Sequence, residues 1–179
     1  MYALLRPGYI SFDTRYYISN KKIVSLSKHA YKRVVLPQDI FGGRVKYVAE
    51  FLKKDATHID SEQVVVAGDS VEMFCEEWLN WLKTIGMPFF RKYSDIEQLD
   101  LAFNQQPPDE FPPLVLSGAN RVIRGSIISV FANSSQNKTN DLLEKYDAHV
   151  KSGNVNHGLP EDFQAIKEII LNLKDRRLD

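Results

Sequence analysis

The chain has 179 residues, 44% of them apolar, and its 23 basic and 23 acidic residues balance. This length and apolar content fit one globular domain with a hydrophobic core. No apolar run approaches the roughly 20 residues that span a bilayer, and the N-terminus lacks a signal-peptide pattern, so we expect no membrane partner. Cys75 is the only cysteine, which excludes an intrachain disulfide and favours a cytoplasmic location.

The charges are sorted along the sequence. Residues 1–54 carry 11 Lys or Arg and 3 Asp or Glu, whereas residues 55–112 carry 3 and 12. Residues 113–179 are nearly balanced, with 9 basic and 8 acidic residues. A basic, Tyr-rich first third followed by an acidic middle bears on the choice of partners rather than on the fold.

The first third of the chain, residues 1–54, is predicted to contain several β-strands. Apolar and polar residues alternate from Tyr9 to Ile18, which predicts a half-buried strand. A polar turn follows, and residues 23–27 and 31–36 are interpreted as two further strands. Three consecutive valines within residues 64–67 predict a buried strand that joins the same small antiparallel sheet.

The clearest predicted helix follows that strand. Asp69 and Glu72 have the spacing of a capping box. The inward face of the helix is expected to hold Phe74, Trp78, Trp81, Leu82 and Ile85. Gly86 and Pro88 are expected to end it. A second capping box, Ser94 with Glu97, predicts another short helix.

The remainder is predicted to be helical. Residues 104–113 contain four prolines and form a seam between an α+β part, residues 1–103, and a helical part, residues 114–179. Three helices are expected beyond the seam, at 115–131, 140–150 and 160–173. We predict a single α+β domain over residues 1–179, in which helices pack on a small N-terminal antiparallel sheet and the C-terminal half is mostly helical.

The predicted core combines the inward positions of these elements. It comprises Phe12, Val65, Phe74, Trp78, Leu82, Ile85, Phe90, Leu99, Ile127, Phe131, Phe163, Ile166 and Ile170.

One segment favours an enzyme. Residues 64–70, Val-Val-Val-Ala-Gly-Asp-Ser, place a serine between a buried strand and a helix, a position that suits a nucleophile near helix-terminal amides. This block resembles the first motif of the GDSL serine esterases, and Gly118-Ala-Asn120 resembles part of a second motif. The resemblance implies a catalytic set of Ser70, Asn120 and His157. The chain departs from the family at Arg121, which replaces an Asp, and neither His149 nor His157 lies in an Asp-x-x-His. The alternative is that Asp69 caps a helix.

The sequence contains no recognisable metal-binding or cofactor-binding motif. The four histidines are scattered, and no two of them have the spacing of metal ligands with Cys or carboxylates. There is no Walker A loop and no dinucleotide fingerprint. We therefore predict no metal site and no cofactor.

The basic first third offers a nucleic-acid alternative, because cations can contact phosphates and tyrosine rings can stack on bases. The candidate residues are Arg15, Lys21, Lys22, Lys32 and Arg33. A solvated basic face is the simpler interpretation, since no nucleic-acid-binding motif is present.

The acidic middle favours a protein partner, because a negative surface can steer a basic protein to it. The candidate partner-binding residues are Glu72, Glu76, Glu77, Asp95 and Glu97. The segment 76–99 resembles a helix, Pro-aromatic and capped-helix stretch of uncharacterised bacterial α+β proteins of the immunity-protein type. That resemblance implies a non-enzymatic protein that binds and masks a partner. We take this as the leading hypothesis, ahead of the esterase and the nucleic-acid binder.

Overall fold

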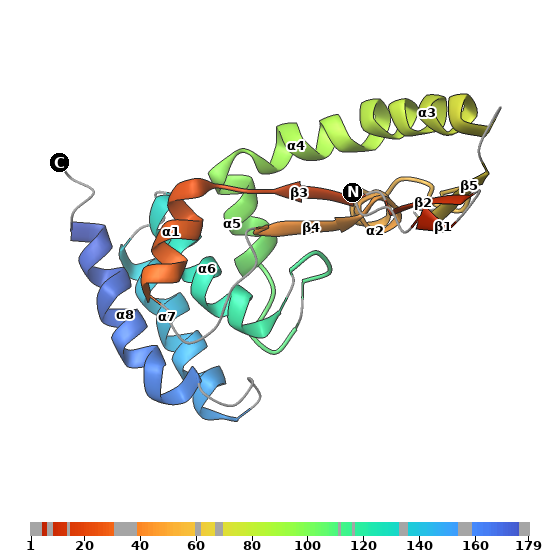
Figure 1. The fold of residues 1–179 in the computed structure, drawn as a ribbon. Helices are drawn as coiled ribbons and strands as arrows, with labels where there is room; N and C mark the ends of the chain where they lie inside the picture. The colour runs from red at the N-terminus through yellow and green to blue at the C-terminus, as the bar shows by residue number, and fades with distance from the viewer. Residues whose placement is uncertain are drawn as a thin grey trace.

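The computed structural model describes residues 5–6, 9–13, 15–30, 39–59, 62–66, 70–110, 112–115, 117–132, 136–153 and 159–175. It shows an α+β protein with small antiparallel sheets near the N-terminus, helices packed on them, and a C-terminal half that is mostly helical (Figure 1). The predicted fold class is confirmed.

The described strands all precede Ser70, and the described elements from there on are helical. The first part contains β1 (Leu5–Arg6), β2 (Tyr9–Asp13), β3 (Arg15–Ile18), α1 (Lys21–Ala30), β4 (Phe41–Arg44), α2 (Val45–Phe51) and β5 (Glu62–Val66). The second part contains α3 (Ser70–Trp81), the π-helical turn η1 (Leu82–Gly86), α4 (Met87–Tyr93), α5 (Ile96–Asn104), α6 (Gly118–Phe131), α7 (Gln136–Lys151) and α8 (Leu159–Asp175).

The predicted strand at 9–18 is two strands that belong to different sheets. β2 pairs with β1 and β5, whereas β3 pairs only with β4 among the described strands. In β4, Gly42 has φ 145°, and a Cβ there would lie 2.1 Å from the backbone oxygen of Tyr16. Only glycine therefore fits at this position, where β4 pairs with β3.

The predicted strand at 23–27 is wrong, because this segment lies in helix α1. The side-chain oxygen of Asn20 accepts hydrogen bonds from the backbone N–H groups of Lys22 and Ile23, at 3.0 and 3.2 Å. Such capping starts a helix, and Ile23, Val24 and Ser27 then form its buried face. The third predicted strand, at 31–36, lies outside the described residues.

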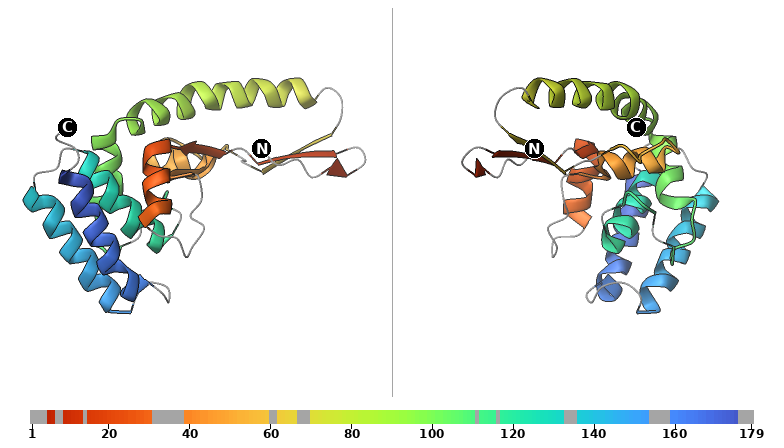
Figure 2. Two further views of the ribbon diagram at one scale, coloured as in Figure 1. Left: turned by 60° about the vertical axis from the view of Figure 1, so that its left-hand side comes forward. Right: turned by 90° about the vertical axis from the view of Figure 1, so that its right-hand side faces the viewer.

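The helix that begins at Ser70 does not end at Gly86 and Pro88. It continues through η1 into α4 as one long rod (Figure 2). Pro88 has no N–H to donate to the Thr84 carbonyl, and the Lys54 ammonium donates to that oxygen instead. The N–H of Met87 donates to Leu82 O, five residues back, which is the π-helical pattern. The chain thus accommodates Pro88 within the rod.

The rod joins two regions of the molecule. We call β1, β2, β5 and α3 the arm, and the remaining elements the body. Figure 2 shows the arm extending away from the helices of the body. The main hydrophobic core lies in the body and crosses the predicted seam, since it includes Phe41 and Phe89 before the seam and Leu114 and Ile123 after it. The division into domains stays a prediction.

The core differs from the prediction at the rod. Trp81 is buried, with 3% exposure, whereas Trp78 is half-buried. The predicted core residues that are buried are Phe74, Ile85, Leu99, Ile127, Phe163, Ile166 and Ile170. Leu82, Phe90 and Phe131 are half-buried, and the side chains of Phe12 and Val65 are outside the described part.

Candidate functional site

The outward surface of α3 combines carboxylates with exposed apolar side chains. Val71, Cys75 and Leu79 recur every four residues, so they form one stripe along the helix. All three are exposed, Leu79 by 44%. Glu72 and Glu76 are also exposed. Each comes one residue after a member of the stripe, so the two carboxylates lie along one edge of it. We call these five residues the acid–apolar face.

The acid–apolar face lies apart from the side of α3 that packs on the rest of the protein. Phe74 and Trp81 are buried on that packed side, as is Ile85 of η1 just beyond it. Met73 is 63% exposed. Going round the helix from the stripe, the two carboxylates of the face come first, and Met73 and Glu77 lie beyond them. The rod thus has the apolar side chains needed for its own packing and further apolar side chains that face solvent.

The structure divides the five predicted partner-binding residues into two groups. Glu72, Glu76 and Glu77 are exposed on α3, while Asp95 and Glu97 start α5 at the other end of the rod. Asp95 lies 19 positions after Glu76 along mostly helical chain, a distance of roughly 30 Å along the rod. Asp95, not Ser94, caps α5, because its carboxylate accepts a 2.8 Å hydrogen bond from the N–H of Glu97.

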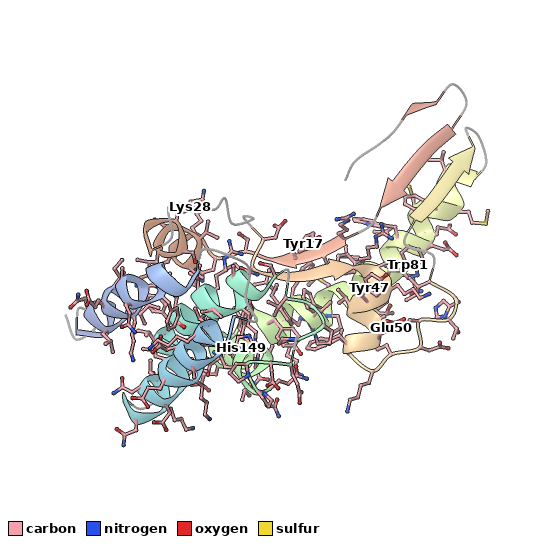
Figure 3. All side chains as sticks on the ribbon, turned by 90° about the horizontal axis from the view of Figure 1, so that it is seen from below. Tyr17, Lys28, Tyr47, Glu50, Trp81 and His149 are labelled. Atoms are coloured by element: carbon pink, nitrogen blue, oxygen red, sulfur yellow. The ribbon has the colours of Figure 1, made fainter. Side chains whose placement is uncertain are left out.

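The predicted nucleic-acid-binding residues are spread over different elements. Arg15 is exposed in β3, and Lys21 and Lys22 are exposed at the start of α1. The Lys22 ammonium lies 4.6 Å from the centroid of the Phe131 ring. Lys32 and Arg33 lie outside the described residues. Figure 3 shows Lys28 at the outer edge of α1, well separated from Tyr17 and Tyr47.

The predicted esterase residues are not brought together in the described part of the chain. Ser70 begins α3 at the outer end of the arm, whereas Asn120 lies in α6, within the body (Figure 1). Asn120 has no exposed surface, and its Nδ2 donates to Ile40 O at 3.2 Å. The side chain of Ser70 and all of His157 lie outside the described part.

The body contains two buried arginines that the sequence did not predict to be buried. Arg121 and Arg124 of α6 are both buried. Arg124 donates to Asp39 O at 2.5 Å, and burial lowers its pKa to about 10 although the nearby Asp39 charge opposes that shift. The Arg121 guanidinium donates to the backbone oxygens of Phe103, Gln106, Pro107, Pro108 and Glu110. It thereby holds the loop after α5 in place.

A cavity of about 540 Å³ lies beside this loop. It is lined by charged and polar residues of α5 and α7, with Ser129 of α6 contributing a hydroxyl on a side chain that is only 3% exposed. A sequence signal for it existed: Asp100 and Asn104 are four residues apart, and Lys138, Asp141 and Lys145 have the spacing of one helix face. Nothing in the sequence showed that the two helices meet.

The described residues include no group of three or more His, Cys, Asp or Glu side chains arranged to hold a metal ion. His149, labelled in Figure 3, is the only histidine in α7. Within the same residues, no helix has both the length and the apolar character to cross a membrane.

None of the protein-family models, curated proteins or solved structures compared with the chain matches it. The function is therefore inferred from the arrangement of the chain's own residues.

Proposed function

We propose that this protein is a non-enzymatic binding protein that recognises and masks a basic partner protein, as an immunity or regulatory protein does. The partner binds the acid–apolar face of α3. The observation that carries the proposal is the stripe of Val71, Cys75 and Leu79 beside Glu72 and Glu76 on an outward surface. Contiguous exposed apolar side chains rimmed by polar ones are typical of protein-interaction sites.

The two kinds of side chain would act at different stages of association. Carboxylates attract a basic surface over a distance of about one Debye length, which raises the association rate. Apolar side chains become buried only in the final complex and slow its dissociation. The partner surface should therefore carry Lys or Arg side chains next to apolar ones.

The position of the face supports the same function. The rod carries α3 away from the helices of the body (Figure 2), so a partner reaches the outward side of α3 without displacing an element of the fold. Trp81 and Ile85 anchor the inner end of α3 on the opposite side. Binding therefore needs no rearrangement of the body.

The test starts with the tagged full-length chain, purified from its native host at low and moderate salt, and measures the Kd of the protein that co-purifies. We expect Glu72→Lys with Glu76→Lys to weaken binding about a hundredfold at low salt, about tenfold for each reversed charge. The loss should shrink as salt is added, because salt screens exposed charges. Leu79→Asp should weaken binding at every salt concentration.

The matched control reverses Glu144 and Glu168, which are exposed on α7 and α8. This pair changes the net charge by the same amount and should leave the Kd within about twofold of the wild type. Equal weakening by the control would mean that overall charge, not the face of α3, is recognised. Recovery of RNA or DNA in place of a protein would contradict the proposal and favour the basic first third.

A further inference from the structure

The cavity in the body is separate from the acid–apolar face, and hydrogen bonds hold several of its lining residues in place. Asn104 of α5 is one of the residues that line it. Its amide nitrogen donates to Asp100 Oδ1 at 2.7 Å and to Gly125 O at 2.9 Å, and its amide oxygen accepts a 2.6 Å hydrogen bond from the Tyr146 hydroxyl. Both hydrogens of the Asn104 amide are therefore used within the fold, and Asp100 is held in one orientation.

The loop wall is equally well supported. Pro107 and Pro108 line the cavity, and their carbonyl oxygens accept hydrogen bonds from Arg121 at 2.8 and 3.1 Å. With the carbonyl groups directed to Arg121, the proline rings supply an apolar wall. Leu142 of α7 adds a second apolar contact.

The α7 wall carries charges of both signs. Lys138, Asp141 and Lys145 line the cavity from one face of the helix. Among the residues that the structure describes, neither Asp141 nor Lys145 forms an ion pair. With Asp100, the cavity is lined by two carboxylates and two ammonium groups.

We propose that this cavity binds a small zwitterion of dipeptide size, with a free ammonium group, a free carboxylate and an apolar middle. An anion or a cation alone would meet as many like charges as opposite ones, whereas a zwitterion can satisfy both. Its ammonium group binds Asp141, and its carboxylate binds Lys145. Its aliphatic part contacts Pro107, Pro108 and Leu142.

The size of the cavity agrees with this ligand. Its volume of about 540 Å³ lies within the range of small-molecule sites. It equals the volume of about 18 water molecules at roughly 30 Å³ each, which is close to the number of heavy atoms in a dipeptide with two aliphatic side chains.

The test is a titration of the ¹⁵N-labelled full-length protein with leucylleucine, followed by NMR. Two capped forms, N-acetyl-leucylleucine and leucylleucine amide, each remove one of the ligand's charges. We expect leucylleucine to give saturable shifts of the backbone signals of Asn104, Asp141 and Lys145. Each capped form should bind about tenfold more weakly or worse, because it lacks one charged contact.

Two substitutions assign the charges. Asp141→Asn should weaken the binding of leucylleucine about tenfold but leave the affinity for the N-acetyl form unchanged, because that form has no ammonium group. Lys145→Gln should weaken the binding of leucylleucine by a similar factor but leave the affinity for the amide form unchanged, because that form has no carboxylate. Glu144→Gln, on α7 but outside the cavity lining, should change neither affinity. All three sites are exposed, so the variants should melt at the wild-type temperature. Absence of saturable shifts, or equal affinity for the capped and free dipeptides, would overturn the proposal.

Discussion

Helices α3 and α6 use charged and apolar residues in opposite ways. α6 buries an unbroken run of 11 residues, Asn120 to Val130, with two arginines among them. α3 exposes Leu79 and Met73 and keeps only one side for packing. A buried cation must have hydrogen-bond partners, and the backbone carbonyls around α6 supply them. Nothing in the described fold covers the exposed apolar residues of α3. Stability is therefore expected to depend on α6, and recognition on α3.

The largest expected change in the free energy of unfolding is at the inner end of α3, where this helix packs on the body. Trp81→Ala should lower the free energy of unfolding by about 3–5 kcal/mol, because it empties a buried site. Trp78→Ala, three residues further out and half-buried, should lower it by less than half as much. Urea denaturation of the two variants measures the difference. Equal losses would show that the whole helix, not only its inner end, supports the core.

The next largest effect tests the arginine in α6. Arg121→Met keeps the aliphatic stem but removes the donors to five backbone carbonyls. We expect a loss of about 3 kcal/mol, since some of these acceptors are left buried without donors. Arg91→Met, at an exposed site in α4, is the matched control and should stay within about 0.5 kcal/mol of wild type. A neutral Arg121→Met would mean that solvent can replace the guanidinium.

A smaller effect concerns pH. Burial raises the pKa of Tyr146 to about 12, whereas an unfolded tyrosine titrates near 10. The folded state therefore holds its proton more tightly, so the contribution of Tyr146 is complete below pH 10 and is lost as the pH rises towards 12. Tyr146→Phe should lose about 1 kcal/mol at pH 7, from the hydrogen bond to Asn104.

The same variant should lose less stability than the wild type between pH 10 and 12. Thermal melts across that range provide the measurement. Tyr16, whose pKa burial also raises to about 12, remains in both proteins, so their difference isolates Tyr146. Parallel curves for the two proteins would assign the alkaline transition to Tyr16 instead.

The smallest effect is expected on the outer side of α3. Leu79→Ser and Met73→Ser should each change the free energy of unfolding by no more than about 0.5 kcal/mol, because both side chains are exposed. Denaturant midpoints measure this directly. A loss of about 2 kcal/mol or more would show that the outer surface of α3 is structural, and the contrast with α6 would disappear.

Much of the fold could be predicted because hydrophobic periodicity is a local signal. It placed the helices at α3, α6, α7 and α8 and the strand at β5. It was wrong at 23–27, where two apolar residues in a row fit a strand as well as a helix and the cap at Asn20 decided the outcome. It also merged β2 and β3, since alternation continues across a change of sheet.

The candidate sites were less predictable, because they depend on contacts between distant segments. Glu72 and Glu76 were identified from charge alone, and the inward positions of Phe74 and Trp81 were predicted. The exposure of Leu79 beside the carboxylates was found only in the structure. The cavity depends on the approach of α5 to α7, which residues 105–135 separate in sequence. Gly125 of α6 is close to both helices, since a Cβ there would lie 2.6 Å from Asn104 Oδ1 of α5 and 3.0 Å from the Tyr146 hydroxyl of α7. No local pattern encodes that approach.

The π-helical turn η1 sets the direction in which α3 faces. A π-helical turn holds about one residue more than an α-helical turn, and each residue of an α-helix rotates the chain by about 100°. Deleting one residue between Leu82 and Gly86 would therefore restore an ordinary α-helix and rotate α3 by about a quarter turn. Not one side chain of α3 would change, yet Glu72 and Leu79 would face a different direction. An insertion or deletion at this point is a way for related sequences to redirect the same surface while keeping its chemistry.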